Sequence, residues 1–270
     1  MKMRASASVT SRRDTQVHPT AIVHPDAHLG AGVVVGPWAL VGPAVVVGNG
    51  TEVGPRVLIE KDTTIGEDCF LSNGAVLGSD PQDLKYQGEH TTLEIGDRTV
   101  IREFATLNRG TSALGRTVVG SDCLLMAYTH IAHDCEIGNH VILSNSVNMA
   151  GHVSIQDWAI VGGLTPIHQF VRIGAHAFVG GGSRIPQDVP PYCRAAGNPT
   201  RLFGLNAVGL ERRGFSEDVR VALRKAYKML FQSDMSLSKA LDKVEEEALA
   251  FPEVGHLLEF IRASERGITT

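Results

Sequence analysis

The sequence predicts a β protein, a left-handed parallel β-helix of hexapeptide repeats with a C-terminal α-helical domain. The first observation is an aliphatic residue or Met at every sixth position of residues 17–77, and again of residues 119–185. The second is a small or β-branched residue two positions earlier, as at Ala39, and often a Gly one position later, as at Gly36. A six-residue repeat of this kind is the signature of a parallel β-helix.

The period also predicts which residues stack. Strand side chains alternate, so each aliphatic residue and the small residue two positions before it both point into the core. Three hexads, or about 18 residues, close one triangular coil, and successive coils lie roughly 4.8 Å apart. We expect the Gly after each aliphatic residue to supply the backbone angles that the turns need.

The 270 residues divide into three parts. Residues 1–15 are polar and basic and predict a disordered tail or a misassigned start. Residues 16–190 form the β-helix, with loop excursions at 78–94 and 108–118. Residues 191–270 form a helical domain that covers the open end of the coils. In it, Ser216 predicts a helix start, and two further helices are expected around 237–249 and 252–262.

Composition points to a cytoplasmic protein. There is no secretory signal and no apolar run long enough for a membrane span. Cys69, Cys123 and Cys135 fall at inward positions of the repeat, which predicts core residues and neither a disulfide framework nor a zinc site. The chain carries a formal net charge of −4 and no interleaved basic and aromatic residues, so we expect no nucleic-acid partner.

Charge is concentrated in residues 194–228, which hold eight Lys or Arg against three acids. Two interpretations stay open. The stretch is either a solvated helix face or a docking surface for an acidic partner or for phosphates.

Histidines cluster on one strip of the predicted coils. The register stacks residues 131, 149 and 167, and beside them stand His130, His133, His152 and His168. Gly151 and Gln169 share the column of His133. Asp134 is placed to orient the imidazole of His133, and the Gly151 N–H is a candidate oxyanion donor. We expect a functional site here, without a metal.

The excursions interrupt a solenoid that does not need them. Insertions in solenoids tend to gather on the binding face. The first contains Gln82, Asp83 and Lys85 beside Tyr86. An ordinary polar loop and a substrate clamp are equally compatible with this composition.

Several motifs resemble one family, the UDP-N-acetylglucosamine O-acyltransferases of lipid A biosynthesis. They are HIAHDC at 130–135, AGHV at 150–153, GG-x-T-x-x-HQF at 162–170, PQDLKY at 81–86, LNRGT at 107–111, QDVPPY at 187–192 and GLN-x-x-GL-x-RRGF at 204–215. The resemblance implies a cytoplasmic homotrimer without a cofactor. It also implies transfer of a (R)-3-hydroxyacyl chain from acyl carrier protein to the 3-hydroxyl of UDP-N-acetylglucosamine.

The resemblance also implies roles. His133 matches the general base, Asp134 its supporting carboxylate and Gly151 the oxyanion donor. The residues that match the sugar, acyl and nucleotide sites are Gln82, Asp83, Lys85, His130, His152, His168, Gln169, Asn206, Arg212 and Arg213. The basic stretch at 212–228 fits the acidic acyl carrier protein. Gly181 matches the position that limits acyl length, and Phe178 is a second candidate.

Two positions depart from the family pattern. Val208 stands where members often carry a Glu near the uridine, and Pro199 stands where some carry a His. Alternatives also remain open at this point. They are the N-acyltransferase of the same pathway, a coenzyme A-dependent acetyltransferase, a zinc-dependent carbonic anhydrase and a non-catalytic scaffold.

Overall fold

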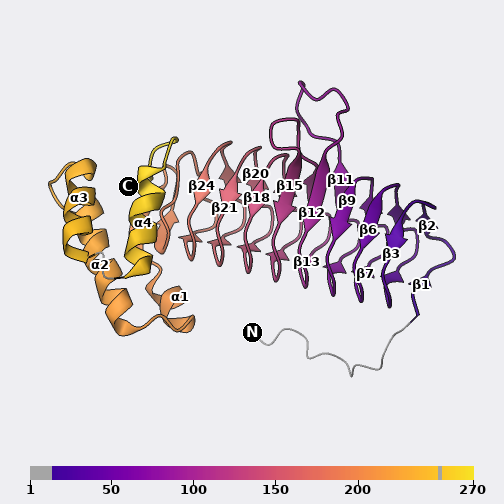
Figure 1. Cartoon of the computed structure of the whole chain (residues 1–270), viewed down its shortest axis with the longest axis horizontal. Helices are drawn as coiled ribbons and strands as arrows, with labels where there is room; N and C mark the ends of the chain where they lie inside the picture. Colours follow the sequence, from indigo (N-terminus) through magenta and orange to yellow (C-terminus); the bar gives the residue numbers. More distant parts are fainter. Residues whose placement is uncertain (1–13, 249–250) are drawn as a thin grey trace.

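The computed structural model describes residues 14–248 and 251–270, so all but the last two residues of the predicted 1–15 tail lie outside the described residues. Short strands stack into a three-sided prism, and four helices lie at one end of it (Figure 1). This confirms the predicted fold class.

Each side of the prism is one sheet. The first sheet holds, in order, β1 (Gln16–Val17), β4 (Val34–Val35), β7 (Glu52–Val53), β10 (Phe70–Leu71), β13 (Val100–Ile101), β16 (Leu124–Leu125), β19 (Ile142–Leu143), β22 (Ile160–Val161), β25 (Phe178–Val179), β26 (Cys193–Ala196) and β27 (Arg201–Leu205). The second holds β2 (Ile22–Val23), β5 (Leu40–Val41), β8 (Leu58–Ile59), β11 (Val76–Ser79), β14 (Thr106–Asn108), β17 (His130–Ile131), β20 (Asn148–Met149) and β23 (Pro166–Ile167). The third holds β3 (His28–Leu29), β6 (Val45–Val47), β9 (Thr63–Ile65), β12 (Thr92–Ile95), β15 (Arg116–Val119), β18 (Glu136–Ile137), β21 (Ser154–Ile155) and β24 (Arg172–Ile173).

The register follows the hexads. Ile131 pairs with Met149 and Met149 with Ile167, in parallel strands, as the period predicts. At the excursions the ladder continues, because Leu77 pairs with Leu107 and Leu107 with Ile131. The excursions therefore project from the prism without shifting the core, and Figure 1 shows them standing out beside β11, β12 and β15.

The predicted role of the glycines is wrong. The turns place their left-handed residue three positions after the aliphatic one, where Trp38 has φ 55° and Asp134 has φ 58°. The glycine after the aliphatic residue is needed for a different reason. A β-carbon on Gly36 would lie 2.9 Å from the backbone nitrogen of Pro55 on the next coil. Close stacking of the coils, and not an unusual turn angle, excludes a side chain there.

The helical domain comprises α1 (Ala207–Arg212), α2 (Glu217–Phe231), α3 (Leu237–Ala248) and α4 (Pro252–Arg262). The Ser216 hydroxyl caps α2 by accepting a hydrogen bond from the Val219 N–H, as predicted. α3 and α4 match the other two expected helices, although residue 249 lies outside the described residues. α1 and the antiparallel pair β26–β27 were not expected from the sequence.

All four cysteines are buried and free, which confirms the interpretation of Cys69, Cys123 and Cys135 as core residues. Burial raises the pKa of the Cys123 thiol to about 11. No helix within residues 14–248 and 251–270 is long and apolar enough to cross a membrane.

Candidate active site

The prism has three edges, and the predicted site residues divide among them. The turns from the second to the third sheet form the histidine edge, which carries His133 and His152. The turns from the third to the first sheet form the tryptophan edge, which carries Trp158 and His176. The turns from the first to the second sheet form the glycine edge, which carries Gly181. Both excursions leave the second sheet and return at the third, so they lie on the histidine edge.

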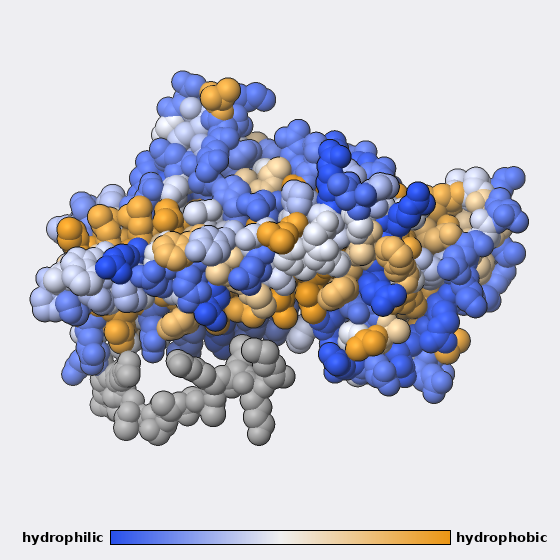
Figure 2. Space-filling model, turned by 180° about the vertical axis from the view of Figure 1, so that it is seen from behind, coloured by the Kyte–Doolittle hydropathy of each residue, from blue (hydrophilic) through white to orange (hydrophobic). Residues whose placement is uncertain are grey.

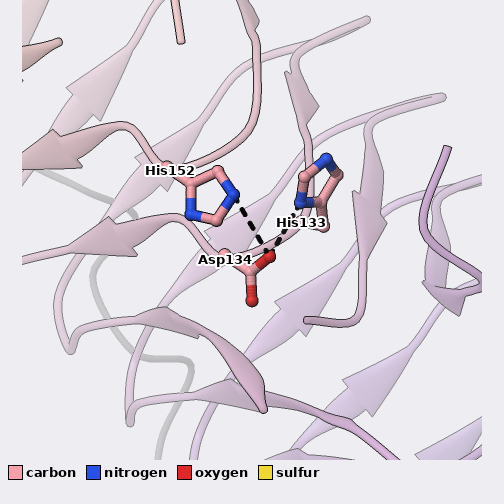
Figure 3. A group of neighbouring side chains, drawn as sticks. All are labelled: His133, Asp134 and His152. Atoms are coloured by element: carbon pink, nitrogen blue, oxygen red, sulfur yellow. Dashed lines mark hydrogen bonds and ion pairs between the residues drawn. The ribbon is translucent and has the colours of Figure 1, made fainter. Parts of the chain in front are cut away.

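His133 and Asp134 form a hydrogen-bonded pair on this edge (Figure 3). The His133 Nδ1 lies 2.8 Å from Asp134 Oδ2. Asp134 is 1% exposed, so its carboxylate is not free to turn into solvent. An imidazole bonded through Nδ1 presents Nε2 with its lone pair outward, which is the form that accepts a proton.

The second excursion holds the carboxylate of Asp134. Thr111 donates its backbone N–H to Oδ1 at 2.9 Å and its hydroxyl to Oδ2 at 2.6 Å, and the Leu114 N–H reaches Oδ1 at 3.3 Å. Burial by itself would raise the pKa of Asp134. The hydrogen bonds from Thr111 and His133, with the nearby His152, outweigh burial and lower that pKa. The carboxylate is therefore held ionised.

The pKa values of two neighbouring histidines are lowered, which favours their neutral form. Burial, with a smaller effect of His133, lowers the pKa of His130, whose Nδ1 lies 2.8 Å from the Thr106 hydroxyl. Burial also lowers the pKa of His152, although the charges of Asp134 and Asp83 oppose the shift. The His152 ring meets that of His133 edge to face, at 5.2 Å between centroids, and stacks on Phe170.

Gly151 lies directly beneath His133. A β-carbon at Gly151 would come within 2.5 Å of His133 Cε1 and 2.7 Å of Nε2. Among the described residues, no group accepts a hydrogen bond from the Gly151 N–H. The predicted column is therefore present, with a free donor close to the imidazole nitrogen.

Gln169 is exposed at the next coil, in the predicted column, and the adjacent His168 is exposed as well. A residue that sequence reasoning missed lies beside them. Arg266, from the segment after α4, brings its Nη2 to 3.0 Å from His168 Nδ1. Asp188 ties this segment to the coils through backbone hydrogen bonds with Gly267 and Thr269. No local pattern signals this contact, because 98 residues separate the two partners.

The first excursion carries Gln82, Asp83 and Lys85 on the same edge. Asp83 is close enough to His152 for its charge to oppose the lowering of that histidine's pKa. Gln82 and Lys85 are exposed. The fully buried Arg109, from the second excursion, donates to the Gly78 carbonyl and forms an ion pair with Asp80. The repeat pattern assigned no role to Arg109 or Thr111. Both belong to the LNRGT motif, which was the one feature of the sequence that could have marked them as site residues.

The predicted nucleotide residues lie on the tryptophan edge. Asn206 is buried, donates to the His176 carbonyl and caps α1. Arg213 stacks over Trp158, 5.2 Å from the ring centroid, and its Nη1 lies 3.3 Å from His176 Nδ1. Arg212 is exposed at the end of α1. Within one chain, the structure does not bring these residues to the histidine edge.

The predicted acyl-length residues lie elsewhere again. Gly181 is exposed on the glycine edge, and Phe178 lies half-buried on β25 of the first sheet. Pro199, in the turn between β26 and β27, follows Gly197, whose carbonyl accepts a hydrogen bond from the Arg184 N–H. Val208 is 59% exposed on α1. One chain therefore carries three separate groups of predicted site residues.

His133, Asp134 and His152 also place potential metal-ligand atoms within 4.8 Å of one another. A zinc ligand oxygen lies about 2.0–2.2 Å from the metal. Asp134 Oδ2 instead accepts hydrogen bonds from both Thr111 and His133. A metal ion bound to this oxygen would compete with its hydrogen bonds to Thr111 and His133.

Comparisons with known proteins agree with one another. The family described as Udp N-acetylglucosamine O-acyltransferase, Domain 2, matches residues 188–269, and the bacterial transferase hexapeptide (six repeats) matches residues 44–79 and 116–151. The acyl-[acyl-carrier-protein]–UDP-N-acetylglucosamine O-acyltransferase of Burkholderia lata is 56% identical over 259 residues, which are 94% of this chain and 99% of that relative.

Solved structures give the same result. LpxA of Acinetobacter baumannii is 43% identical, with a TM-score of 0.92 over 94% of this chain and 99% of that one. The UDP-N-acetylglucosamine O-acyltransferase of Moraxella catarrhalis is 40% identical, with a TM-score of 0.91 over the same shares.

Proposed function

The chain belongs to the UDP-N-acetylglucosamine O-acyltransferase family, and we propose that it transfers a (R)-3-hydroxyacyl chain from acyl carrier protein to the 3-hydroxyl of UDP-N-acetylglucosamine. This reaction is the first step of lipid A biosynthesis, and we place it in the cytoplasm. Family membership makes the chain an acyltransferase and not a carbonic anhydrase or a scaffold. It also favours an O-acyltransferase over the N-acyltransferase and the coenzyme A-dependent enzyme.

The single observation that carries the mechanism is the His133–Asp134 pair above Gly151. With Nδ1 bonded to Asp134, His133 Nε2 takes the proton from the sugar 3-hydroxyl. The hydroxyl oxygen then attacks the carbonyl carbon of the thioester. The ionised Asp134 stabilises the imidazolium that forms, which is the role of a supporting carboxylate.

The tetrahedral intermediate places negative charge on the former carbonyl oxygen. The Gly151 N–H, with no other acceptor among the described residues, is suited to donate to that oxygen. When the intermediate collapses, the carbon–sulfur bond breaks and His133 returns its proton to the thiolate of acyl carrier protein. The products are the O-acylated sugar nucleotide and free thiol, so protons and bonds balance.

Substrate binding uses more than one chain in this proposal. His130, His152, His168, Gln169, Gln82, Asp83 and Lys85 surround the sugar and the start of the acyl chain. Asn206, Arg212 and Arg213 bind the nucleotide, where a guanidinium suits a diphosphate. Since these groups occupy different edges of one prism, a homotrimer that joins edges of neighbouring protomers completes the site.

Exposed apolar side chains support such packing. Ile22, Trp38 and Phe70 are between 39% and 66% exposed along the prism. Figure 2 shows hydrophobic groups distributed along the body of the molecule, and a mostly hydrophilic loop projecting from it. Assembly would cover the apolar side chains while the loop reaches towards a neighbour.

The helical domain offers a surface for acyl carrier protein. Arg220, Arg224 and Lys228 recur every fourth residue of α2, so they share one face, beside a cavity of about 230 Å³. This face is complementary to an acidic partner.

The test is incubation of the purified protein with UDP-N-acetylglucosamine and a panel of acyl carrier protein thioesters, followed by mass spectrometry of the sugar nucleotide. The expected product gains one 3-hydroxyacyl ester. A parallel reaction uses the 3-amino analogue of the acceptor. Acylation of the amine alone, or transfer from coenzyme A thioesters alone, would contradict the proposal.

A further inference from the structure

Thr111 lies in the second excursion but is only 7% exposed. Its side chain points inward, against the carboxylate of Asp134. Thr111 contributes two of the hydrogen bonds that reach the Asp134 carboxylate, one from its N–H to Oδ1 and one from its hydroxyl to Oδ2. No other side-chain hydroxyl within the described residues donates to this carboxylate.

Asp134 Oδ2 has two competing histidine partners. His133 Nδ1 lies 2.8 Å away and His152 Nε2 lies 3.7 Å away. Figure 3 shows both imidazoles directed at the same oxygen from different coils. The bond to His133 keeps the imidazole proton on Nδ1 and leaves Nε2 as the acceptor for the sugar hydroxyl. The direction of the carboxylate therefore decides which histidine is activated.

The segment that carries Thr111 is fixed at its base. The side chain of Asn108 donates to the Asp80 carbonyl at 2.8 Å, and the buried guanidinium of Arg109 bonds Gly78, Asp80 and the Tyr86 hydroxyl. Thr111 therefore meets Asp134 from a backbone that the first excursion already holds in place.

We propose that Thr111 is a positioning residue for the reaction, which directs the Asp134 carboxylate to His133 and away from His152. The expected effect on kcat rests on the proposed function, whereas the effect on the His133–Asp134 hydrogen bond does not depend on the substrate. Without the hydroxyl, Oδ2 loses its 2.6 Å donor and the carboxylate turns towards His152. His133 then loses its partner, and the attacking hydroxyl loses an oriented base.

The test compares Thr111→Val with Thr111→Ser, and uses Thr99→Val as the matched control. Thr99 is also buried, and its hydroxyl also donates to one group, the Gly120 carbonyl at 2.8 Å, and accepts from another, the Cys123 N–H at 3.2 Å. It directly precedes β13 of the first sheet, at the tryptophan edge and not at the histidine edge. Each variant is assayed for kcat and for KM of UDP-N-acetylglucosamine, and the histidine nitrogens are observed by NMR without substrate.

Thr111→Val is expected to lower kcat roughly ten- to a hundredfold, the equivalent of one hydrogen bond to a charged group, with KM changed less than about twofold. In its spectrum the hydrogen-bonded Nδ1–H signal of His133 is lost and the pKa of His152 rises. Thr111→Ser restores both, and Thr99→Val changes neither.

An unchanged His133 signal in Thr111→Val overturns the proposal, as does an equal loss of kcat in Thr99→Val. If Thr111→Val does not fold, Thr111→Ala is measured in its place, with the same outcomes. A shifted NMR signal with no acyl transfer by the wild-type protein would instead refute the proposed function and retain the pairing.

Discussion

The imidazole of His133 rests against the α-carbon of Gly151, at a distance that leaves no room for a side chain. A β-carbon at Gly151 would fall 2.5 Å from Cε1 of that ring, closer than nonbonded carbons approach. The contact therefore sets the position of the His133 ring and requires glycine at position 151 on the next coil. A general base acts only within hydrogen-bond reach of its proton, so a small displacement of this ring has a large kinetic effect.

We expect Gly151→Ala to lower kcat by about a hundredfold or more, because the new methyl displaces His133 from the sugar hydroxyl. The measurement is steady-state acyl transfer, with thermal unfolding to verify the fold. Gly255→Ala is the control, since a β-carbon there meets no atom within 4 Å. Normal turnover in Gly151→Ala would show that the ring is not held where the mechanism needs it.

Replacement of the base itself gives the second prediction. His133→Ala should lower kcat roughly 10²–10⁴-fold, the usual contribution of general base catalysis, while the assembly stays intact by light scattering. His28→Ala, an exposed histidine on β3, should retain full activity. Near-normal turnover of His133→Ala would end the assignment, and the neighbouring His152 would become the candidate base.

The sequence predicts the histidine edge because the hexad register is strict. A period of six fixes which residues stack, so the column of His133, Gly151 and Gln169 follows from counting. The register also shows that the predicted site residues of the coils lie on different edges of the prism. This requires each residue to be assigned to one of the three turns of its coil. Asn206 and Arg213 lie beyond the repeats, where no period applies, and their contacts with His176 and Trp158 depend on how the helical domain packs.

The support of Asp134 was not predictable in the same way. Thr111 lies in an excursion, whose path is set by the buried Arg109 and by hydrogen bonds that have no sequence period. The role of the repeat glycines was predicted wrongly for a related reason. Their constraint comes from the adjacent coil, as the contact between Gly36 and Pro55 shows, and not from their own turn.

Metal removal gives the third prediction. Although His133, Asp134 and His152 are close together, the attack on a thioester by an alcohol with a histidine base needs no Lewis acid. Exhaustive dialysis against a chelator should leave kcat unchanged, with metal content followed by mass spectrometry. Loss of activity that zinc alone restores would favour a ligand role for the three side chains.

Stability should depend on pH through His176 on the tryptophan edge. Burial, with the charge of Arg213 as a smaller cause, lowers the pKa of His176 from 6.5 to about 4. Below pH 6.5 the unfolded chain takes up a proton that the folded chain resists, so stability falls as the pH drops from 6.5 to 4. We expect His176→Phe, which keeps a ring between Trp158 and Tyr192, to reduce this loss by on the order of 2 kcal/mol.

The measurement is chemical unfolding of both proteins at several pH values. His130 and His152 also have lowered pKa values, and they contribute equally to both curves. His256 has a lowered pKa too, and its charge is a minor cause of the lowered pKa of His176. The difference between the slopes therefore reports His176 together with its coupling to His256. Parallel slopes from pH 6.5 to 4 would show that its protonation is not linked to folding.

Acyl-chain length is the last prediction, and it concerns Gly181 on the glycine edge. We expect the acyl chain to lie in a groove that passes Gly181, and an exposed position without a side chain leaves such a groove open. The wild-type enzyme should then prefer a long acyl group, on the order of 12–14 carbons, since each covered methylene contributes about 0.8 kcal/mol. A β-carbon at Gly181 would lie 3.1 Å from the Gly163 carbonyl oxygen, which a small backbone adjustment accommodates. Gly181→Met should therefore fold and shift the preference towards shorter chains.

The measurement is kcat/KM for a series of acyl carrier protein thioesters, with Phe178→Ala as the comparison. Because Gly181 is not on the histidine edge of its own chain, its effect requires the groove to extend across a protomer boundary or over the second sheet. If the wild-type enzyme prefers ten carbons and Gly181→Met keeps that preference, Gly181 does not set the length. Phe178, half-buried on β25, then becomes the residue that closes the groove, and Phe178→Ala should lengthen the preferred chain.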